Sequence, residues 1–514
     1  MLRFALRVSL LALAVALYPA LKAFSLLGPV SSWQTTAIGY PGIIGPKNIN
    51  EEFRWNVPTL YYSFDNTFLT YFGTKGVAEV ERAIKIMNDL PSASNIDLAN
   101  FPAEARRSNL RAQALNLMDL RSVTLALLLE RMGVEASPRY VYTLHGRNDN
   151  PICCTSVSVT RRNFDPDTFR VSSYINNTLY TYRSILCGCS PVQIAYPINV
   201  PVDPLASAEP VSAMFAALAY NTRFGVGQFY TGLTKDDVGG LRYIYRQSNV
   251  NYESVIPLVT GGSSSPWSVP GATNIVTYYT NAVRFGVEKL QWVRVDAESL
   301  LGETYPAFTN RYSERVIVNG VVREQQMQRT IDLPDMIFVA ADLALDATAV
   351  TVGSTGTGRT ITFQSSGAGI VGNAMYSQVW SNLQLDPVIN GAIGEGPGLI
   401  TGPNIIAFNS VGPLAVNFPN AAFIAETNAT PSFVWGSFDS STNITIYPDG
   451  ASIMEMEAAT ISGVVGGLPG GGSQESPWIV PAIFTTTTTT DTGNSTGLSS
   501  GGTGGGTSGG SSNP

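Results

Sequence analysis

The chain of 514 residues contains a single histidine, His145. Histidine is the usual general base at physiological pH and the commonest metal ligand in proteins. Ser-His-Asp and Cys-His catalytic groups need a histidine, and catalytic zinc sites commonly use two or three. His145 stands in a turn-rich run from Leu144 to Pro151, which is typical of a surface loop. We therefore expect no histidine-based catalysis in this protein.

Charged residues are also scarce, at 13% of the chain, and the formal net charge is −7. A surface with this balance repels a phosphate backbone, so we expect no nucleic-acid partner. The 49 glycines, 31 prolines and 22 tyrosines are more typical of β-rich exported proteins than of cytosolic enzymes. A membrane helix needs roughly 20 apolar residues, and no later stretch has that length, so the mature chain is expected to have no transmembrane segment.

The first 25 residues have the order of a secretory signal peptide. Arg3 and Arg7 precede an apolar run at residues 8–17, and small residues follow at Ala23 and Ser25. The alternative is a retained anchor, but the apolar run is shorter than the roughly 20 residues that a bilayer requires. We predict cleavage after Ala23 or Ser25 and an exported protein that is periplasmic, extracellular or bound to the cell surface.

Cysteine is limited to two close pairs, Cys153 with Cys154 and Cys187 with Cys189. In an oxidising compartment this even number predicts two disulfides. The alternative is a site with four thiolate ligands, but zinc ligands are usually spaced by two or more residues, which the adjacent Cys153 and Cys154 are not. The disulfide reading is favoured, and the pairing of the four cysteines stays open.

The segment 51–250 predicts a mixture of strands and helices. A β-branched and aromatic run at 58–64 predicts a strand, and apolar residues at helical spacing predict a helix over 76–90. A second helix is expected from Asp119, as its N-cap, to Gly133, as its C-terminal stop. The middle of this second helix is apolar on all sides, so it should lie buried in the centre of its domain.

The order of these elements resembles the matrixin branch of the metzincin metallopeptidases. The resemblance rests on the strand ending at Asp65, the two helices, and a closing run of Leu233-Thr-Lys-Asp-Asp-Val238 before Leu241-Arg-Tyr-Ile-Tyr245. In that family the buried helix carries the motif H-E-x-x-H-x-x-G-x-x-H. Alignment on Gly133 implies zinc-ligand positions at Ala126, Glu130 and Ala136, and a catalytic-glutamate position at Leu127.

Three of these four degenerate zinc-site positions hold side chains that cannot bind a metal ion or accept a proton. A catalytic zinc needs three protein ligands and an open position for water, so Glu130 alone is insufficient. The sequence therefore predicts no catalytic residue, no metal and no cofactor. Oxygen-rich runs at 148–150 and 165–167 are alternatives for calcium, but neither has the spacing of a calcium loop, and both are better explained as Asx turns.

The second half of the chain predicts short strands with glycine and proline turns. Asn319-Gly320 between valine-rich runs predicts a two-residue hairpin, and the runs at 350–352 and 360–363 predict another. Further strands are expected around Trp292 and at 443–447. A shared Ser-Pro-Trp-x-Val-Pro sequence at 265–270 and 476–481 is interpreted as a marker of the two boundaries of this half. Residues 485–514 are almost entirely threonine, glycine, serine and asparagine, which predicts a disordered tail.

We therefore expect a multidomain protein, with an α/β (α+β) metzincin-like domain, all-β sandwich-like domains and a disordered tail. The hypothesis for function is a non-enzymatic binding or structural protein of the cell surface or periplasm, with a surface, matrix or polysaccharide partner. The alternative is a secreted hydrolase that acts through carboxylates. The expected division is a signal peptide (1–25), an extension (26–50), the metzincin-like domain (51–250), a linker (251–272), a β-rich domain (273–385), a β-sandwich (386–481) and the tail (482–514).

Overall fold

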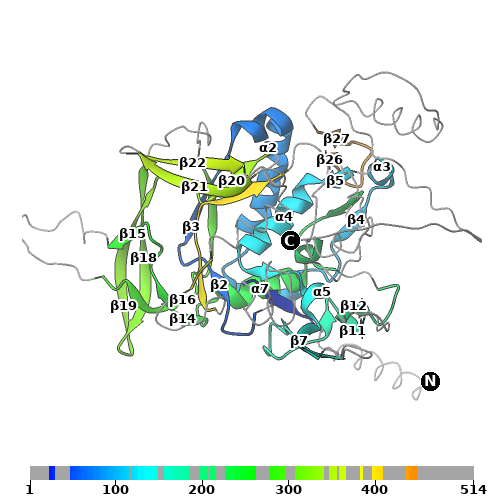
Figure 1. Ribbon diagram of the computed structural model, residues 1–514, viewed down its shortest axis with the longest axis horizontal. Helices are drawn as coiled ribbons and strands as arrows, with labels where there is room; N and C mark the ends of the chain where they lie inside the picture. The colour runs from blue at the N-terminus through cyan, green and yellow to red at the C-terminus, as the bar shows by residue number, and fades with distance from the viewer. Residues whose placement is uncertain are drawn as a thin grey trace, which may run out of the picture.

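The computed structural model describes fourteen stretches of the chain. These are residues 22–28, 47–115, 117–148, 156–184, 197–206, 209–214, 226–261, 278–295, 307–340, 347–355, 358–365, 383–385, 396–408 and 434–447. Their fold is mixed α/β, rich in sheet and with few helices (Figure 1). In these stretches no helix is long and apolar enough to cross a membrane. The four cysteines, both copies of the Ser-Pro-Trp sequence and the predicted tail lie outside them.

A parallel sheet of four strands forms the centre of the protein. Its order is β17 (Gln291–Arg294), β3 (Thr59–Phe64), β20 (Met336–Val339) and β25 (Asn404–Ala407), and every neighbouring pair is parallel. All four residues of β20 are buried, as expected for a strand that is covered on both faces. The predicted strand at 58–64 is confirmed as β3.

Two helices cover one side of this sheet. Helix α2 (Asn66–Asn88) packs on the sheet and α4 (Leu120–Arg131) packs on α2 (Figure 1). The prediction for α4 is confirmed, including its N-cap, because the Asp119 carboxylate accepts a hydrogen bond from the backbone N–H of Ser122 at 2.9 Å. The predicted helix at 76–90 also exists, but it begins ten residues earlier than expected, at Asn66, with a kink at Gly73.

An antiparallel sheet of five strands lies on the other side of the central sheet (Figure 1). The predicted hairpin at Asn319-Gly320 is confirmed, with both residues at positive φ, and its strands are eleven residues long. Phe308, at the start of the hairpin, meets the ring of Tyr61 in β3 at a centroid distance of 5.0 Å. The order of the sheet is β14 (Val250–Ser254), β16 (Asn281–Phe285), β18 (Phe308–Val318), β19 (Val321–Ile331) and β15 (Val259–Gly261).

Sheets run across the predicted boundaries at 250 and 385. Strand β3 pairs with β17 and β20, and β25 extends the same sheet. Strand β24 (Gly398–Ile400) pairs in parallel with β2 (Phe53–Arg54), and β26 (Val434–Ser437) pairs in parallel with β5 (Leu117–Asp119). The sheet-rich character of the second half is confirmed, and its division into separate domains stays a prediction.

A small sheet takes up residues that the sequence assigns to the signal peptide. Strand β1 (Phe24–Leu26) lies between β6 (Val134–Glu135) and β9 (Asn163–Phe164), and it pairs antiparallel with both. All three residues of β1 are buried. Two of the residues that precede the predicted cleavage after Ser25 are thus part of a sheet in the body of the protein.

The remaining elements are the closing helix, several shorter helices and the other strands. The closing helix α7 (Lys235–Tyr245) begins with a capping box between Thr234 and Asp237. The other helices are α3 (Leu110–Ala114), α5 (Ser137–Tyr140), η2 (Ala93–Asn95), η3 (Leu98–Asn100) and η4 (Val211–Ala213). The other strands are β4 (Arg106–Ser108), β7 (Thr143–Asn148), β8 (Ser156–Thr160), β10 (Tyr174–Ile175), β11 (Thr178–Ser184), β12 (Pro197–Pro201), β13 (Gln228–Tyr230), β21 (Ala347–Thr355), β22 (Gly358–Ser365), β23 (Leu383–Leu385) and β27 (Thr445–Ile446).

Candidate functional site

The residues that the resemblance assigns to zinc-site positions lie in the closed core of the protein. Ala126 and Leu127, on α4, are 2% and 0% exposed, and Ala136, just after the helix, is 3% exposed. Every residue of helix α4 except Arg121 is buried, as expected for a central helix. Neither a metal ligand nor a surface for substrate is present at these three positions.

Glu130, the one carboxylate among these positions, is part of a buried ion pair. Its Oε1 accepts a hydrogen bond from Nη1 of Arg131 at 3.0 Å, and both side chains are almost fully buried. Burial raises the pKa of Glu130 to about 8, although the charge of Arg131 opposes this rise. Within the described stretches no group of three or more His, Cys, Asp or Glu side chains is arranged to hold a metal ion.

The other predicted sites lie apart from α4. His145 is exposed, as expected, but it lies in strand β7 rather than in a loop, because residues 143–148 pair with β8. The Asx turn predicted at 165–167 is confirmed, since Oδ1 of Asp165 accepts hydrogen bonds from the backbone N–H groups of Asp167 and Thr168. The cysteine pairs Cys153 with Cys154 and Cys187 with Cys189 lie outside the described residues, so their disulfides stay predictions.

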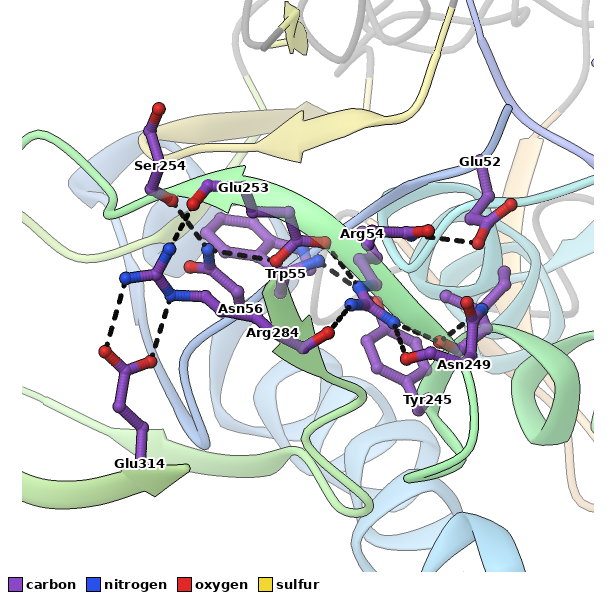
Figure 2. A network of polar contacts seen from close by, with 12 residues as sticks. Glu52, Arg54, Trp55, Asn56, Tyr245, Asn249, Glu253, Ser254, Arg284 and Glu314 are labelled. Atoms are coloured by element: carbon purple, nitrogen blue, oxygen red, sulfur yellow. Dashed lines mark hydrogen bonds and ion pairs between the residues drawn. The ribbon is translucent and has the colours of Figure 1, made fainter. Parts of the chain in front are cut away.

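A buried network of polar side chains joins β2 to α7 and to the five-stranded sheet. Arg54, at its centre, donates from Nε to Oε1 of Glu253 at 2.7 Å and from Nη1 to the carbonyl of Asn249 at 2.9 Å. Its Nη2 donates to the carbonyl of Arg284 at 3.1 Å. Figure 2 shows Arg54 with Asn249 at one end of this network and the ion pair of Arg284 with Glu314 at the other.

These contacts among Arg54, Asn249, Glu253, Arg284 and Glu314, here called the Arg54 network, stabilise charges that would otherwise be costly to bury. Both charged groups of the pair between Arg54 and Glu253 are fully buried. Burial raises the pKa of Glu253, and the charge of Arg54 and its hydrogen bond oppose that rise. An isolated charge in such a place costs several kcal/mol, so the network depends on each partner being present.

A cavity of about 210 Å³ opens beside the outer end of the Arg54 network. Its wall consists of Asn56, Pro58, Gln247 and the segments 284–288 and 312–315. A water molecule occupies about 30 Å³ in the liquid, so this volume is equivalent to roughly seven waters. The cavity therefore has room for one small polar molecule or one unit of a larger chain.

The cavity offers hydrogen-bonding groups together with aromatic surface. Within the described residues, Oδ1 of Asn56, the side-chain amide of Gln247 and the hydroxyl of Tyr312 have no hydrogen-bond partner. The guanidinium of Arg315 lies over the ring of Phe285 at 5.2 Å from its centroid. Two acidic side chains, Glu288 and Glu314, and two basic ones, Arg284 and Arg315, line the cavity, so its wall carries no net charge. This balance favours a neutral ligand with hydroxyl or amide groups over an ion.

No pattern in the sequence predicts this cavity, because its residues come from distant parts of the chain. Asn56 and Glu253, which hydrogen-bond beside it, are 197 residues apart. Tyr312 and Glu314 alternate with more exposed residues along β18, which predicts a half-buried strand but not what faces its inner side.

A second and wider cavity of about 630 Å³ lies near β1 and is lined by Lys22, Asp165, Asp167 and residues 170–174 among others. Its charged groups mostly pair with each other or with nearby hydroxyls. Nζ of Lys22 lies 3.0 Å from Oδ2 of Asp167, and Nη1 of Arg161 donates to Oγ of Ser173 at 3.1 Å. These contacts within the protein explain why charged side chains line this cavity.

Comparisons of this chain with protein-family models, curated proteins and solved structures find no match, so its function is inferred from its own residues.

Proposed function

We propose that this chain is an exported, non-enzymatic binding or assembly protein of the cell surface or periplasm. In this proposal the segment 51–250 is an inactive metallopeptidase-like unit, and the sheet-rich segments after it serve as binding or structural modules. The ligand is a neutral saccharide unit of a surface or matrix polysaccharide, which the cavity at Asn56 and Tyr312 accommodates.

The observation that carries the proposal is the environment of α4. Ala126 and Leu127 are packed among core side chains, and Glu130 is paired with Arg131. A metallopeptidase needs its metal ligands at the floor of an open cleft, where water and substrate can reach the metal ion. Restoring the activity would take several substitutions together with an opening of the core.

The cavity supports binding of a saccharide by its chemistry. Sugar hydroxyls both donate and accept hydrogen bonds, and the free groups of Asn56, Gln247 and Tyr312 include donors and acceptors. Sugar rings also present apolar faces, which the ring of Tyr312 would cover. The Arg54 network holds one wall of this cavity in place, so little ordering would be needed on binding.

The test combines metal analysis with titration of the purified exported protein by neutral oligosaccharides. We expect no stoichiometric zinc, no cleavage of peptides, and saturable binding of at least one oligosaccharide. Tyr312→Phe removes one hydrogen bond and should weaken that binding about threefold to tenfold. Tyr182→Phe, at a half-exposed tyrosine in β11, is the matched control. One zinc per chain that resists chelation, or equal affinity of the two variants, would contradict the proposal.

The alternative function is that of a secreted hydrolase that acts through two carboxylates, and one observation supports this alternative. Glu288 and Glu314 line the same cavity, and glycosidases use a pair of such groups. Both carboxylates already accept strong hydrogen bonds, Glu314 from Nε of Arg284 and Glu288 from the backbone N–H of Ser94. Release of reducing sugar that disappears in both Glu288→Gln and Glu314→Gln would favour the hydrolase.

A further inference from the structure

The segment that the sequence assigns to the end of a signal peptide is built into the body of the protein. Ala23, Leu26 and Leu27 are all 0% exposed, and Phe24 is 1% exposed. Strand β1 is the middle strand of its sheet, so it forms hydrogen bonds on both edges. A segment that is removed during export has no reason to be the central strand of a sheet.

The side chains of this segment make specific contacts with residues far along the chain. The ring of Phe24 stacks on that of Tyr243 in α7, with 5.2 Å between centroids. The hydroxyl of Ser25 hydrogen-bonds Oδ1 of Asn163, which is buried. The backbone N–H of Leu27 donates to the carbonyl of Gly133 at 2.9 Å, where α4 ends.

Lys22, two residues before the strand, extends these contacts. Its side chain is only 12% exposed, and its ammonium group pairs with Asp167 at 3.0 Å. Asp167 also accepts a hydrogen bond from Arg242 of α7. Lys22 therefore connects the N-terminal segment to the turn at 165–168 and to the closing helix.

Either of the predicted cleavages would break this arrangement. Cleavage after Ser25 removes Phe24 and Ser25, and with them both pairs that join β1 to β9. Cleavage after Ala23 removes Lys22 and places a new charged α-amino group on Phe24, where the surroundings are buried and apolar. Burying an unpaired charge is costly.

We propose that the mature chain begins between Leu17 and Lys22, so that β1 and the pair between Lys22 and Asp167 are retained. The cut is a hydrolysis by the signal peptidase of the exporting cell, in which water adds across one peptide bond and leaves a carboxylate on the leader and an α-ammonium group on the mature chain. Small residues that suit such a cut precede Lys22 at Ala16, in Ala14-Val15-Ala16, and at Ala20. This inference rests on the export that the proposed function assumes.

The first test is N-terminal sequencing and intact-mass measurement of the exported product of the full-length chain. We expect a first residue between Leu17 and Lys22. A first residue at Ala23 or later would overturn this inference and leave the proposed export intact. An exported product that keeps Met1 would overturn the proposed cut, whereas a chain that is not exported at all would overturn the export proposal, so the two failures are distinguishable.

The second test compares two forms that are exported behind a leader from another protein, one starting at Lys22 and one at Leu26. The Lys22 form should fold. The Leu26 form should either fail to fold or unfold at a midpoint lower by at least about 5 °C, given the buried contacts that it lacks. Equal midpoints, or a Lys22 form that does not fold, would overturn the inference.

Discussion

Arg54 has no exposed surface, although its guanidinium group carries a full charge. Its hydrogen bonds to Glu253 and to three backbone carbonyls use the planar, forked geometry of the guanidinium group. Lysine has the same charge but offers a single ammonium group. The identity of this residue, and not only its charge, is therefore expected to matter.

We predict that Arg54→Lys lowers the free energy of unfolding by about 3 kcal/mol, because buried carbonyls and the Glu253 carboxylate lose partners. The matched control is Arg82→Lys. Arg82 is exposed and pairs with Glu79 on the surface of α2, where such a pair contributes less than about 1 kcal/mol. Denaturant unfolding of both variants gives the comparison, and equal losses would show that the Arg54 network is not a stabilising feature.

At the scale of elements, the ends of α4 determine how the core is assembled. Gly133 follows the C-terminus of this helix with φ at +95°, and a Cβ atom there would lie 2.3 Å from the carbonyl oxygen of Phe53 in β2. The same residue accepts the hydrogen bond from Leu27 that follows β1. A glycine at this position allows the helix end, β2 and the N-terminal segment to approach one another.

Gly133→Ala is expected to lower the free energy of unfolding by about 3 kcal/mol or more, because the strain of a positive φ adds to a contact with backbone that cannot move easily. Gly320→Ala is the control. Gly320 also has a positive φ, at +75°, but a Cβ atom there would meet nothing within 4 Å, so its loss should be near 1 kcal/mol. Thermal unfolding of the two variants measures the difference, and a smaller loss at Gly133 would show that the close approach is relaxed in solution.

At the scale of the whole molecule, burial raises the pKa values of seven carboxyl groups. Burial raises the pKa of Asp119 to about 6, and those of Glu135 and Glu209 to about 7. Burial is also the largest cause of the raised pKa values of Glu130, Asp236, Asp237 and Glu253. Asp167 differs, since hydrogen bonds from Arg242 and Lys22 outweigh burial and lower its pKa.

These shifts predict that the protein becomes less stable as pH rises from about 5 to about 8. Over this range the folded state binds more protons than the unfolded state, so the free energy of unfolding decreases with pH. The lowered pKa of Asp167 makes the free energy of unfolding increase with pH, but only at pH values below the ordinary pKa of a carboxyl group. Thermal midpoints measured from pH 5 to pH 8 should fall, and Glu130→Gln should flatten the slope. Midpoints that rise across this range would contradict the prediction.

The cysteines supply a further prediction for the exported protein as a whole. Four cysteines in an oxidising compartment should leave no free thiol. Thiol titration in denaturant should give a value near zero before reduction and four after it. Four free thiols without reductant would contradict either export or the disulfides.

The sequence by itself determined the features that depend on neighbouring residues. The Asp119 cap and the extent of α4, the turn at Asn319-Gly320 and the Asx turn at Asp165 were all predicted correctly, because each is governed by hydrogen bonds and backbone angles within a few residues.

Only the tertiary structure decided which strands share a sheet and where α2 and the N-terminal segment lie. Helix α2 begins at Asn66 because the Asp65 side chain caps it by accepting a hydrogen bond from the backbone N–H of Phe68, and because Phe68 and Phe72 pack against Phe408, which is far away in the sequence. Strand β1 contacts Asn163 and Tyr243. The cavity beside the Arg54 network is lined by residues from β16 and β18. Such contacts follow from how distant segments bury apolar surface against each other once their loops close, and no local pattern in the chain encodes that choice.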